Sequence, residues 1–282
     1  MHDIQDMSRE NKRIFAIKDE SLPQDRILGY LVYYETAKAF YVELPDDADE
    51  WETPLLLSSF VKKGEHSIGG YWSRLWVEQR AVPPDRQNIG QILKENNLSE
   101  YDTFSMLMIS MGRCEQDSCF LEEIDETMLP GFVKLRWQNK VEDVVPLENK
   151  RLLVFFRNGN VKVVDMKDLK LQSVDAYISV PERFEKVEVQ PDGYGVMWSE
   201  KAVIPDNVLF VKGKSVPISL EDFCSFVRLR VINSSQAAEI LNCSRQNIDD
   251  LIRRNKLHPI REDAKSKLFL KNEIVQRKKA QP

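Results

Sequence analysis

The chain has 282 residues, of which 42% are hydrophobic and 30% are charged. These proportions are typical of globular proteins, and they exclude a collagen, a coiled-coil rod and a wholly disordered chain. No apolar run reaches the roughly 18 residues that a membrane-spanning helix needs, and the polar start of the chain lacks the pattern of a signal peptide. Four cysteines in a chain of this length do not make a disulfide framework. We therefore expect a cytoplasmic protein of two or three domains with no membrane association.

The charge is distributed unevenly along the chain, although the formal net charge is only -5. Residues 1–136 carry 15 basic and 25 acidic side chains, and residues 137–224 carry 12 and 14. Residues 225–282 carry 13 basic and 6 acidic side chains, a net charge of +7. A basic end on an acidic body is expected where that end meets phosphates. A solvated basic face without a partner explains the charge equally well.

The first part of the chain predicts an α+β unit after a frayed polar tail at residues 1–12. β-Formers dominate residues 27–34 and 39–44, and the short polar gap between these runs predicts a hairpin. An acidic loop follows. Apolar spacing then predicts three helices, at residues 71–82, 88–97 and 102–110.

The middle part predicts mainly strands. Residues 151–156 and 161–164 flank Asn158-Gly159, a pair that favours a hairpin with a type I′ turn. A second strand pair is predicted at residues 186–189 and 194–198. The remaining expectations are one or two helical turns at 166–171, a short helix or turn from Ile204, and a linker from Gly213 to Pro217.

The last part predicts two short helices joined by a tight turn. Asn233 and Gln236 have the spacing of a capping box for a first helix that ends at Asn242, a residue suited to left-handed backbone. Ser244 is placed to cap a second helix over residues 245–255. The side chains predicted to point inward from this second helix are Ile248, Leu251 and Ile252.

A β-hairpin and a closing helix are predicted after these two helices. Residues 257–270 predict the hairpin, with Lys265 and Lys267 near its tip, and residues 271–279 predict the helix. The expected fold class is therefore α+β, with two small α+β domains (13–131 and 132–215) followed by a helical, winged helix-turn-helix domain (219–282).

The last domain resembles the excisionase and MerR-type winged helix-turn-helix family in residues 234–241, 243–248 and 251–257. The resemblance implies that the second helix meets base edges from its N-terminal turn. Asp249 and Asp250 depart from this pattern, because carboxylates repel phosphates, although Asp249 could accept from a cytosine amino group. A helix-turn-helix used only for protein contacts or dimerisation stays open. The candidate DNA-binding residues are the helix cap Ser244, four predicted to read bases (Arg245, Gln246, Asn247 and Asp249) and four predicted to contact phosphates (Arg253, Arg254, Lys265 and Lys267).

The middle domain resembles the domain-of-unknown-function 2442 family over residues of about 137 to 210. Matching pieces are 144–147, 151–159, 164–166, Phe184 and 193–198. The resemblance implies a small α+β sheet domain that binds a short companion protein in toxin–antitoxin-like gene pairs, and thus protein binding rather than catalysis. We interpret Tyr194 and Trp198 as packing residues of this sheet.

The first domain is similar to the small N-terminal subdomain of HipA-type toxin kinases in residues 29–33, in the helices after Gly70, and in residues 101–114. No glycine-rich nucleotide loop or kinase body accompanies these residues. The resemblance implies a binding module without phosphoryl-transfer chemistry.

The sequence gives no strong signal for an enzyme, a metal or a cofactor. Cys114 and Cys119 have Asp117 between them, but zinc usually takes four Cys or His ligands, and His2, His66 and His258 are distant in sequence. A Cys114–His66 hydrolase stays open without a nucleophile signature. A polar cluster around Pro83-Pro84 is interpreted as a capped helix start, with a binding surface as the alternative; its members are Arg80, Asp85, Arg86, Gln87 and Asn88.

These observations predict a sequence-specific DNA-binding transcriptional regulator of antitoxin-like type. Its partners would be double-stranded DNA, a companion protein and a second copy of the chain. The alternative is a protein-interaction adaptor or antitoxin that neutralises a partner without contacting DNA.

Overall fold

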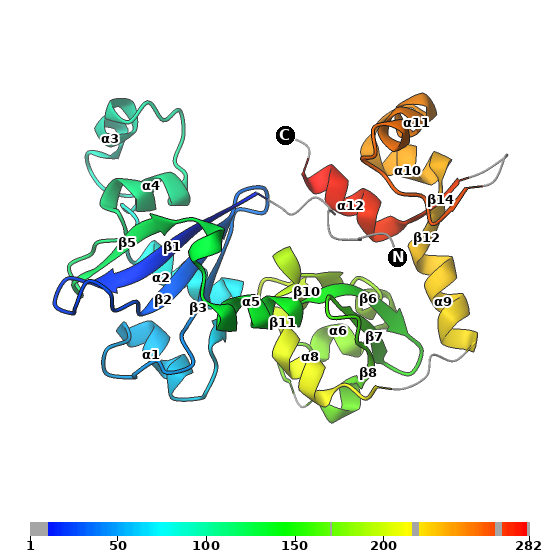
Figure 1. Ribbon diagram of the computed structural model, residues 1–282, viewed down its shortest axis with the longest axis horizontal. Coiled ribbons are helices and arrows are strands. Elements are labelled where there is room, and N and C mark those ends of the chain that lie inside the picture. The colour runs from blue at the N-terminus through cyan, green and yellow to red at the C-terminus, as the bar shows by residue number, and fades with distance from the viewer. Residues whose placement is uncertain (1–10, 170, 216–219, 263–266, 281–282) are drawn as a thin grey trace. The chain divides into compact units, whose positions relative to one another are not determined.

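The computed structural model describes residues 11–169, 171–215, 220–262 and 267–280 (Figure 1). The chain divides into two compact units, Lys12–Trp137 and the part from Gln138 onward. Helices and small antiparallel sheets occur in both units, in agreement with the expected α+β class. None of the helices in the described ranges is long and apolar enough to cross a membrane. We call residues 138–215 the middle segment and residues 220–280 the C-terminal segment.

The N-terminal unit is built on a five-stranded antiparallel sheet in the order β4-β3-β2-β1-β5. Its strands are β1 (Lys12–Asp19), β2 (Gly29–Tyr34), β3 (Ala39–Glu43), β4 (Ser67–Ile68) and β5 (Cys119–Ile124). The predicted hairpin is confirmed as β2 and β3, with Leu31 opposite Val42. The predicted frayed tail at residues 1–12 extends one residue too far, because β1 begins at Lys12. This strand pairs with both β2 and β5.

Short helices surround this sheet. They are α1 (Leu55–Val61), α2 (Gly70–Glu78), α3 (Ile89–Glu95), α4 (Thr103–Ser110), the 3₁₀ turn η1 (Glu126–Met128) and α5 (Gly131–Gln138). The three predicted helices are confirmed as α2, α3 and α4, although α2 ends before the predicted residue 82. The hydrophobic core includes Phe15, Leu31, Trp76 and Leu107, each at most 1% exposed.

The middle segment contains two three-stranded sheets. The first has β6 (Val141–Leu147), β7 (Arg151–Phe156) and β8 (Val161–Asp165) in chain order, and the second has β9 (Glu188–Val189), β10 (Gly195–Ser199) and β11 (Ala202–Pro205) in the order β11-β10-β9. The helical pieces are η2 (Met166–Asp168), α6 (Asp175–Ile178), α7 (Pro181–Phe184), η3 (Pro191–Gly193) and α8 (Asp206–Lys212). Both predicted strand pairs are confirmed.

The turn between β7 and β8 differs from the predicted type I′ turn. Gly159 has a φ of +82°, whereas Asn158 does not have a positive φ, and type I′ needs positive φ at both central residues. The Gly159 amide donates to the Phe156 carbonyl, and the Phe156 amide donates to Asn160. The hairpin loop is therefore longer than the two-residue loop of a type I′ turn, and Gly159 takes its left-handed position.

The predicted linker from Gly213 is wrong at its start. Lys214 exchanges two backbone hydrogen bonds of 3.0 Å with Val163, so the chain after α8 extends the sheet at β8. Val216 and Pro217, at the end of the predicted linker, are outside the described residues.

The C-terminal segment comprises α9 (Leu220–Arg230), β12 (Val231–Asn233), α10 (Ser234–Leu241), α11 (Arg245–Arg253), β13 (Arg261–Glu262), β14 (Lys267–Leu270) and α12 (Lys271–Lys279). Its strands form a sheet in the order β12-β14-β13. The predicted capping box is confirmed: Asn233 accepts from the Gln236 amide, and Gln236 accepts from the Asn233 amide, both at 3.0 Å. Asn242 has the predicted left-handed backbone.

Candidate functional site

The outer face of α11 carries most of the predicted DNA-binding residues. Arg245, Gln246 and Asn247 are exposed in its first turn, whereas Ile248 is fully buried against the core of the C-terminal segment. The Ser244 hydroxyl accepts from the Asn247 amide at 3.2 Å. Ser244 therefore caps the helix, as expected of its residue type, and leaves the neighbouring long side chains to reach outward.

Both carboxylates of α11 have cationic partners. Asp249 accepts from Lys267 Nζ at 2.9 Å, and Lys267 also lies 3.2 Å from a carboxylate oxygen of Glu262 on β13. Asp250 accepts from Arg253 at 2.6 Å, one turn further along the helix.

These ion pairs connect residues that the sequence assigned to separate roles. The hydrogen bonds that Lys267 donates to Asp249 and Glu262 raise its pKa, since both carboxylates favour its charged form. The structure thus joins a predicted base-reading residue, Asp249, to a predicted phosphate-binding residue, Lys267. Arg254 is exposed at the end of α11, and Lys265 lies outside the described residues.

The candidate catalytic residues of the N-terminal unit do not converge. Cys114 Sγ lies 3.7 Å from an oxygen of Asp117, and His66 Nδ1 lies 2.8 Å from the Pro45 carbonyl. Arg80 is buried, pairs with Asp117 and lies 4.1 Å from the centre of the Trp76 ring. The predicted polar cluster is therefore divided, because its other members, residues 85–88, are exposed. Across the described residues, no three His, Cys, Asp or Glu side chains gather as a metal site would require.

Cys119 should resist alkylation in the native protein. Its side chain is buried beside β1, and burial, followed by the charge of Asp117, raises its pKa to about 12. Because the thiolate is the reactive form, we expect iodoacetamide at pH 8 to modify Cys119 more than about 100-fold more slowly than the exposed Cys224. Mass spectrometry of timed digests measures both rates, and urea should abolish the difference. Equal native rates would contradict the burial of Cys119.

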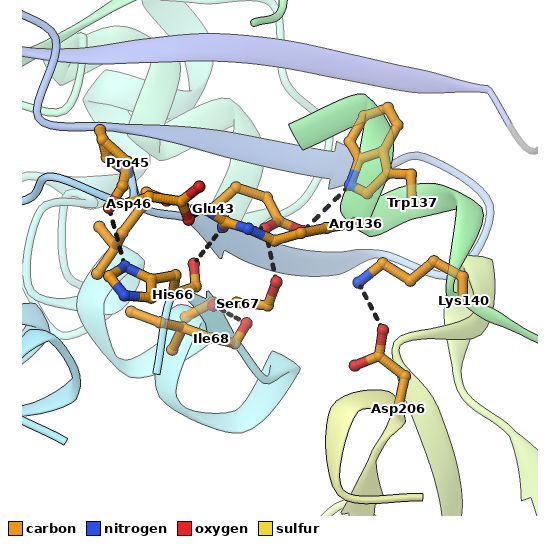
Figure 2. Close-up of polar contacts among 12 residues, drawn as sticks. Glu43, Pro45, Asp46, His66, Ser67, Ile68, Arg136, Trp137, Lys140 and Asp206 are labelled. Carbon is orange, nitrogen blue, oxygen red and sulfur yellow. Dashed lines mark hydrogen bonds and ion pairs between the residues drawn. The ribbon is translucent and has the colours of Figure 1, made fainter. Parts of the chain in front are cut away.

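A buried polar network that the sequence did not predict joins α5 to the sheet of the N-terminal unit (Figure 2). Glu43, at the end of β3, is fully buried and accepts from Ser67 Oγ at 2.6 Å, Arg136 Nη1 at 3.1 Å and Trp137 Nε1 at 3.1 Å. Arg136 also donates to the carbonyls of Leu44 and His66 and to Asp46. The charge of Glu43 is thus compensated by several donors, as burial of a carboxylate requires.

A second buried charge lies in the middle segment. Lys140 is fully buried, and its Nζ lies 3.5 Å from Asp206 Oδ2 (Figure 2). The same Nζ lies 3.0 Å from the centre of the Tyr194 ring. Tyr194 is also buried, which confirms its interpretation as a packing residue. The Trp198 ring stacks on the Phe184 ring, with 6.0 Å between the ring centres. A lysine after a helix and an aspartate at the start of one look like ordinary surface residues in the sequence, so only the fold reveals this pair.

Comparison with known proteins identifies only the middle of the chain. Residues 141–210 match the family model described as "Protein of unknown function (DUF2442)". No curated protein and no solved structure matches the chain. The matched residues run from the start of β6 to near the end of α8 and coincide with the resemblance predicted for the middle segment, which therefore is similar to DUF2442 proteins.

Proposed function

We propose that this protein is a sequence-specific DNA-binding transcriptional regulator, with α11 of its C-terminal segment entering the major groove. In this proposal α10 and α11 form a helix-turn-helix, and β13 and β14 form the wing of an excisionase- or MerR-like domain. The middle segment and the N-terminal unit bind a companion protein or a second copy, as in antitoxin-like regulators.

The exposed first turn of α11 is the observation that supports this proposal most directly. Arg245, Gln246 and Asn247 are residue types that pair with guanine and adenine edges, and they project from a segment with a net charge of +7 between residues 225 and 282. Arg253 and Arg254, also exposed, would contact phosphates. Because Asp249 and Lys267 already bind one another, we expect them to contribute less than Arg245 and Gln246.

DNA binding by the full chain tests the proposal. We expect fluorescence anisotropy to detect a specific complex with the DNA upstream of the protein's own gene, with an affinity that falls steeply as salt rises, because Lys and Arg displace counterions. The double variant Arg245→Ala/Gln246→Ala should lose about 10- to 100-fold of its preference for this site over scrambled DNA, as expected for lost base contacts.

Arg183→Ala supplies the matched control, since Arg183 is an exposed arginine on α7 of the middle segment. It should retain the parent's preference. If the double variant binds and discriminates like the parent, α11 is not the recognition helix. If the parent itself binds no duplex at low salt, the regulator proposal fails.

A protein-interaction adaptor is the second candidate function, and two exposed apolar side chains favour it. Trp51 is 88% exposed and Leu55 is 90% exposed, in and just after an acidic loop of the N-terminal unit. Tryptophan is enriched among the residues that dominate protein interfaces. Co-purification of a stoichiometric companion, lost in Trp51→Ala and without any retained DNA, would favour the adaptor.

A further inference from the structure

The β6-β7-β8 sheet of the middle segment is apolar on both faces. Val144, Leu152 and Val154 point into the main core of this segment. The alternate residues form a second cluster on the outer face, Val145, Leu147, Leu153, Phe155, Val161 and Val163. Antiparallel sheets of small domains commonly leave one face to water, so an apolar outer face needs something to cover it.

Helix α9 covers part of this outer face with one stripe of side chains. Asp222, Phe226 and Arg230 are spaced by four residues and therefore share one side of the helix. Phe226 joins the outer cluster, with its ring centre 5.3 Å from that of Phe155 on β7. Val227 and Arg228, on the other side, are exposed.

Charged groups flank the aromatic contact at both ends of the stripe. Asp222 lies 3.7 Å from Arg151 at the start of β7. Arg230 Nε lies 3.5 Å from Asp143 on β6, and Arg230 Nη2 donates to the Val144 carbonyl. The stripe thus contacts the sheet at three points: the acidic Asp222 at one end, Phe226 in the middle and the basic Arg230 at the other end.

At the Asp143 end, the contact surface favours an arginine over a lysine. Burial raises the pKa of Asp143, and the charge of Arg230 opposes that shift, so the carboxylate needs a cation that reaches it inside the contact. One rigid guanidinium thus makes an ion pair with the carboxylate through Nε, without a hydrogen bond, and donates to a backbone carbonyl through Nη2. A lysine has a single charged nitrogen and cannot reproduce both contacts in the same geometry.

From these contacts we propose that the outer face of the β6-β7-β8 sheet is a helix-binding surface, selective for an acidic residue, an aromatic residue and an arginine at four-residue spacing. Its occupant is α9 of the same chain. Because β12 begins at Val231, directly after Arg230, binding of α9 also holds the C-terminal segment on the middle segment. Asn272 of α12 adds a hydrogen bond of 3.0 Å to the Glu142 carbonyl. This proposal is independent of DNA binding.

Hydrogen exchange of the full chain tests the surface. We expect Phe226→Ala and Arg230→Met each to speed exchange of the α9 amides by about 30-fold or more, the effect of removing a central interface residue. Arg228→Met, an exposed arginine two residues from Arg230, should leave α9 exchange unchanged. Equal effects of the two arginine variants, or no effect of either, would overturn the proposal.

Two further measurements separate release of α9 from loss of folding. Asp143→Asn changes only the middle segment, so it should speed α9 exchange while the amides of α10 and α11 keep their protection. The charge-reversed pair Asp143→Arg/Arg230→Asp should recover at least part of the protection that Arg230→Asp loses. If α9 protection does not recover while α10 and α11 stay protected, the surface does not select for an arginine at position 230. Light scattering should give the same mass for the parent and for Phe226→Ala; a dimer that dissociates in Phe226→Ala would assign α9 to a second copy and overturn the intramolecular occupant.

Discussion

Gly193→Ala should destabilise the middle segment by about 3–5 kcal/mol, one of the largest effects that a single methyl group can have in this protein. Gly193 has a φ of +78°, and a Cβ atom there would lie 2.2 Å from the Val141 carbonyl oxygen and 2.9 Å from its amide nitrogen. Both atoms belong to the β6 backbone, so relief of the overlap requires a strand to move. Urea unfolding followed by circular dichroism measures the change.

Gly159→Ala is the control for this prediction. Gly159 has a similar φ of +82°, but a Cβ atom there has nothing within 4 Å. Its alanine variant incurs only the cost of left-handed backbone, about 1 kcal/mol. The difference between the two variants isolates the overlap with β6. Similar stabilities would contradict the close packing of Gly193 on that strand.

Glu43→Ala should lower the free energy of unfolding of the N-terminal unit by about 3–5 kcal/mol, the cost of removing one partner from a buried ion pair. Arg136, Trp137 and Ser67 all donate to this carboxylate, and the alanine variant leaves these donors facing a cavity. Denaturant unfolding monitored by tryptophan fluorescence is suited to the measurement because Trp137 is one of the donors.

The exposed pair between Glu20 and Arg113 is the matched control for Glu43. Both side chains are about half exposed, and Glu20→Ala should change stability by less than about 1 kcal/mol. Glu43→Gln, which keeps the shape and one acceptor, should fall between the two alanine variants. If Glu43→Ala and Glu20→Ala cost the same, the network in Figure 2 does not stabilise the unit.

Local signals in the sequence predicted local structure well. The capping box of α10, the Ser244 cap of α11 and the left-handed Asn242 are each decided within a few residues, and all three are confirmed. The bounds of α12 agree with the prediction as well. These interactions form between residues close together in the sequence, so they can be predicted without knowing how distant parts of the chain pack.

Long-range pairing limited the rest of the prediction. β1 begins and ends with charged residues that look like a surface loop. Its position between β2 and β5 follows from pairing with residues 12 to 22 and 100 to 110 positions away. The partners of Glu43 are more than 20 and more than 90 residues from it. The same reason explains why Asp249 and Lys267 were assigned separate roles: their pairing depends on the fold of the hairpin after α11.

The ion pair between Asp249 and Lys267 has a consequence for engineering. Transplanting the outer residues of α11 from another protein would remove the acid at position 249 and leave Lys267 with Glu262 alone on the neighbouring strand. A graft that exchanges α11 alone would thus alter the β13-β14 hairpin as well. Because the side chains at positions 249, 262 and 267 pair with one another, all three should be exchanged together in such a graft.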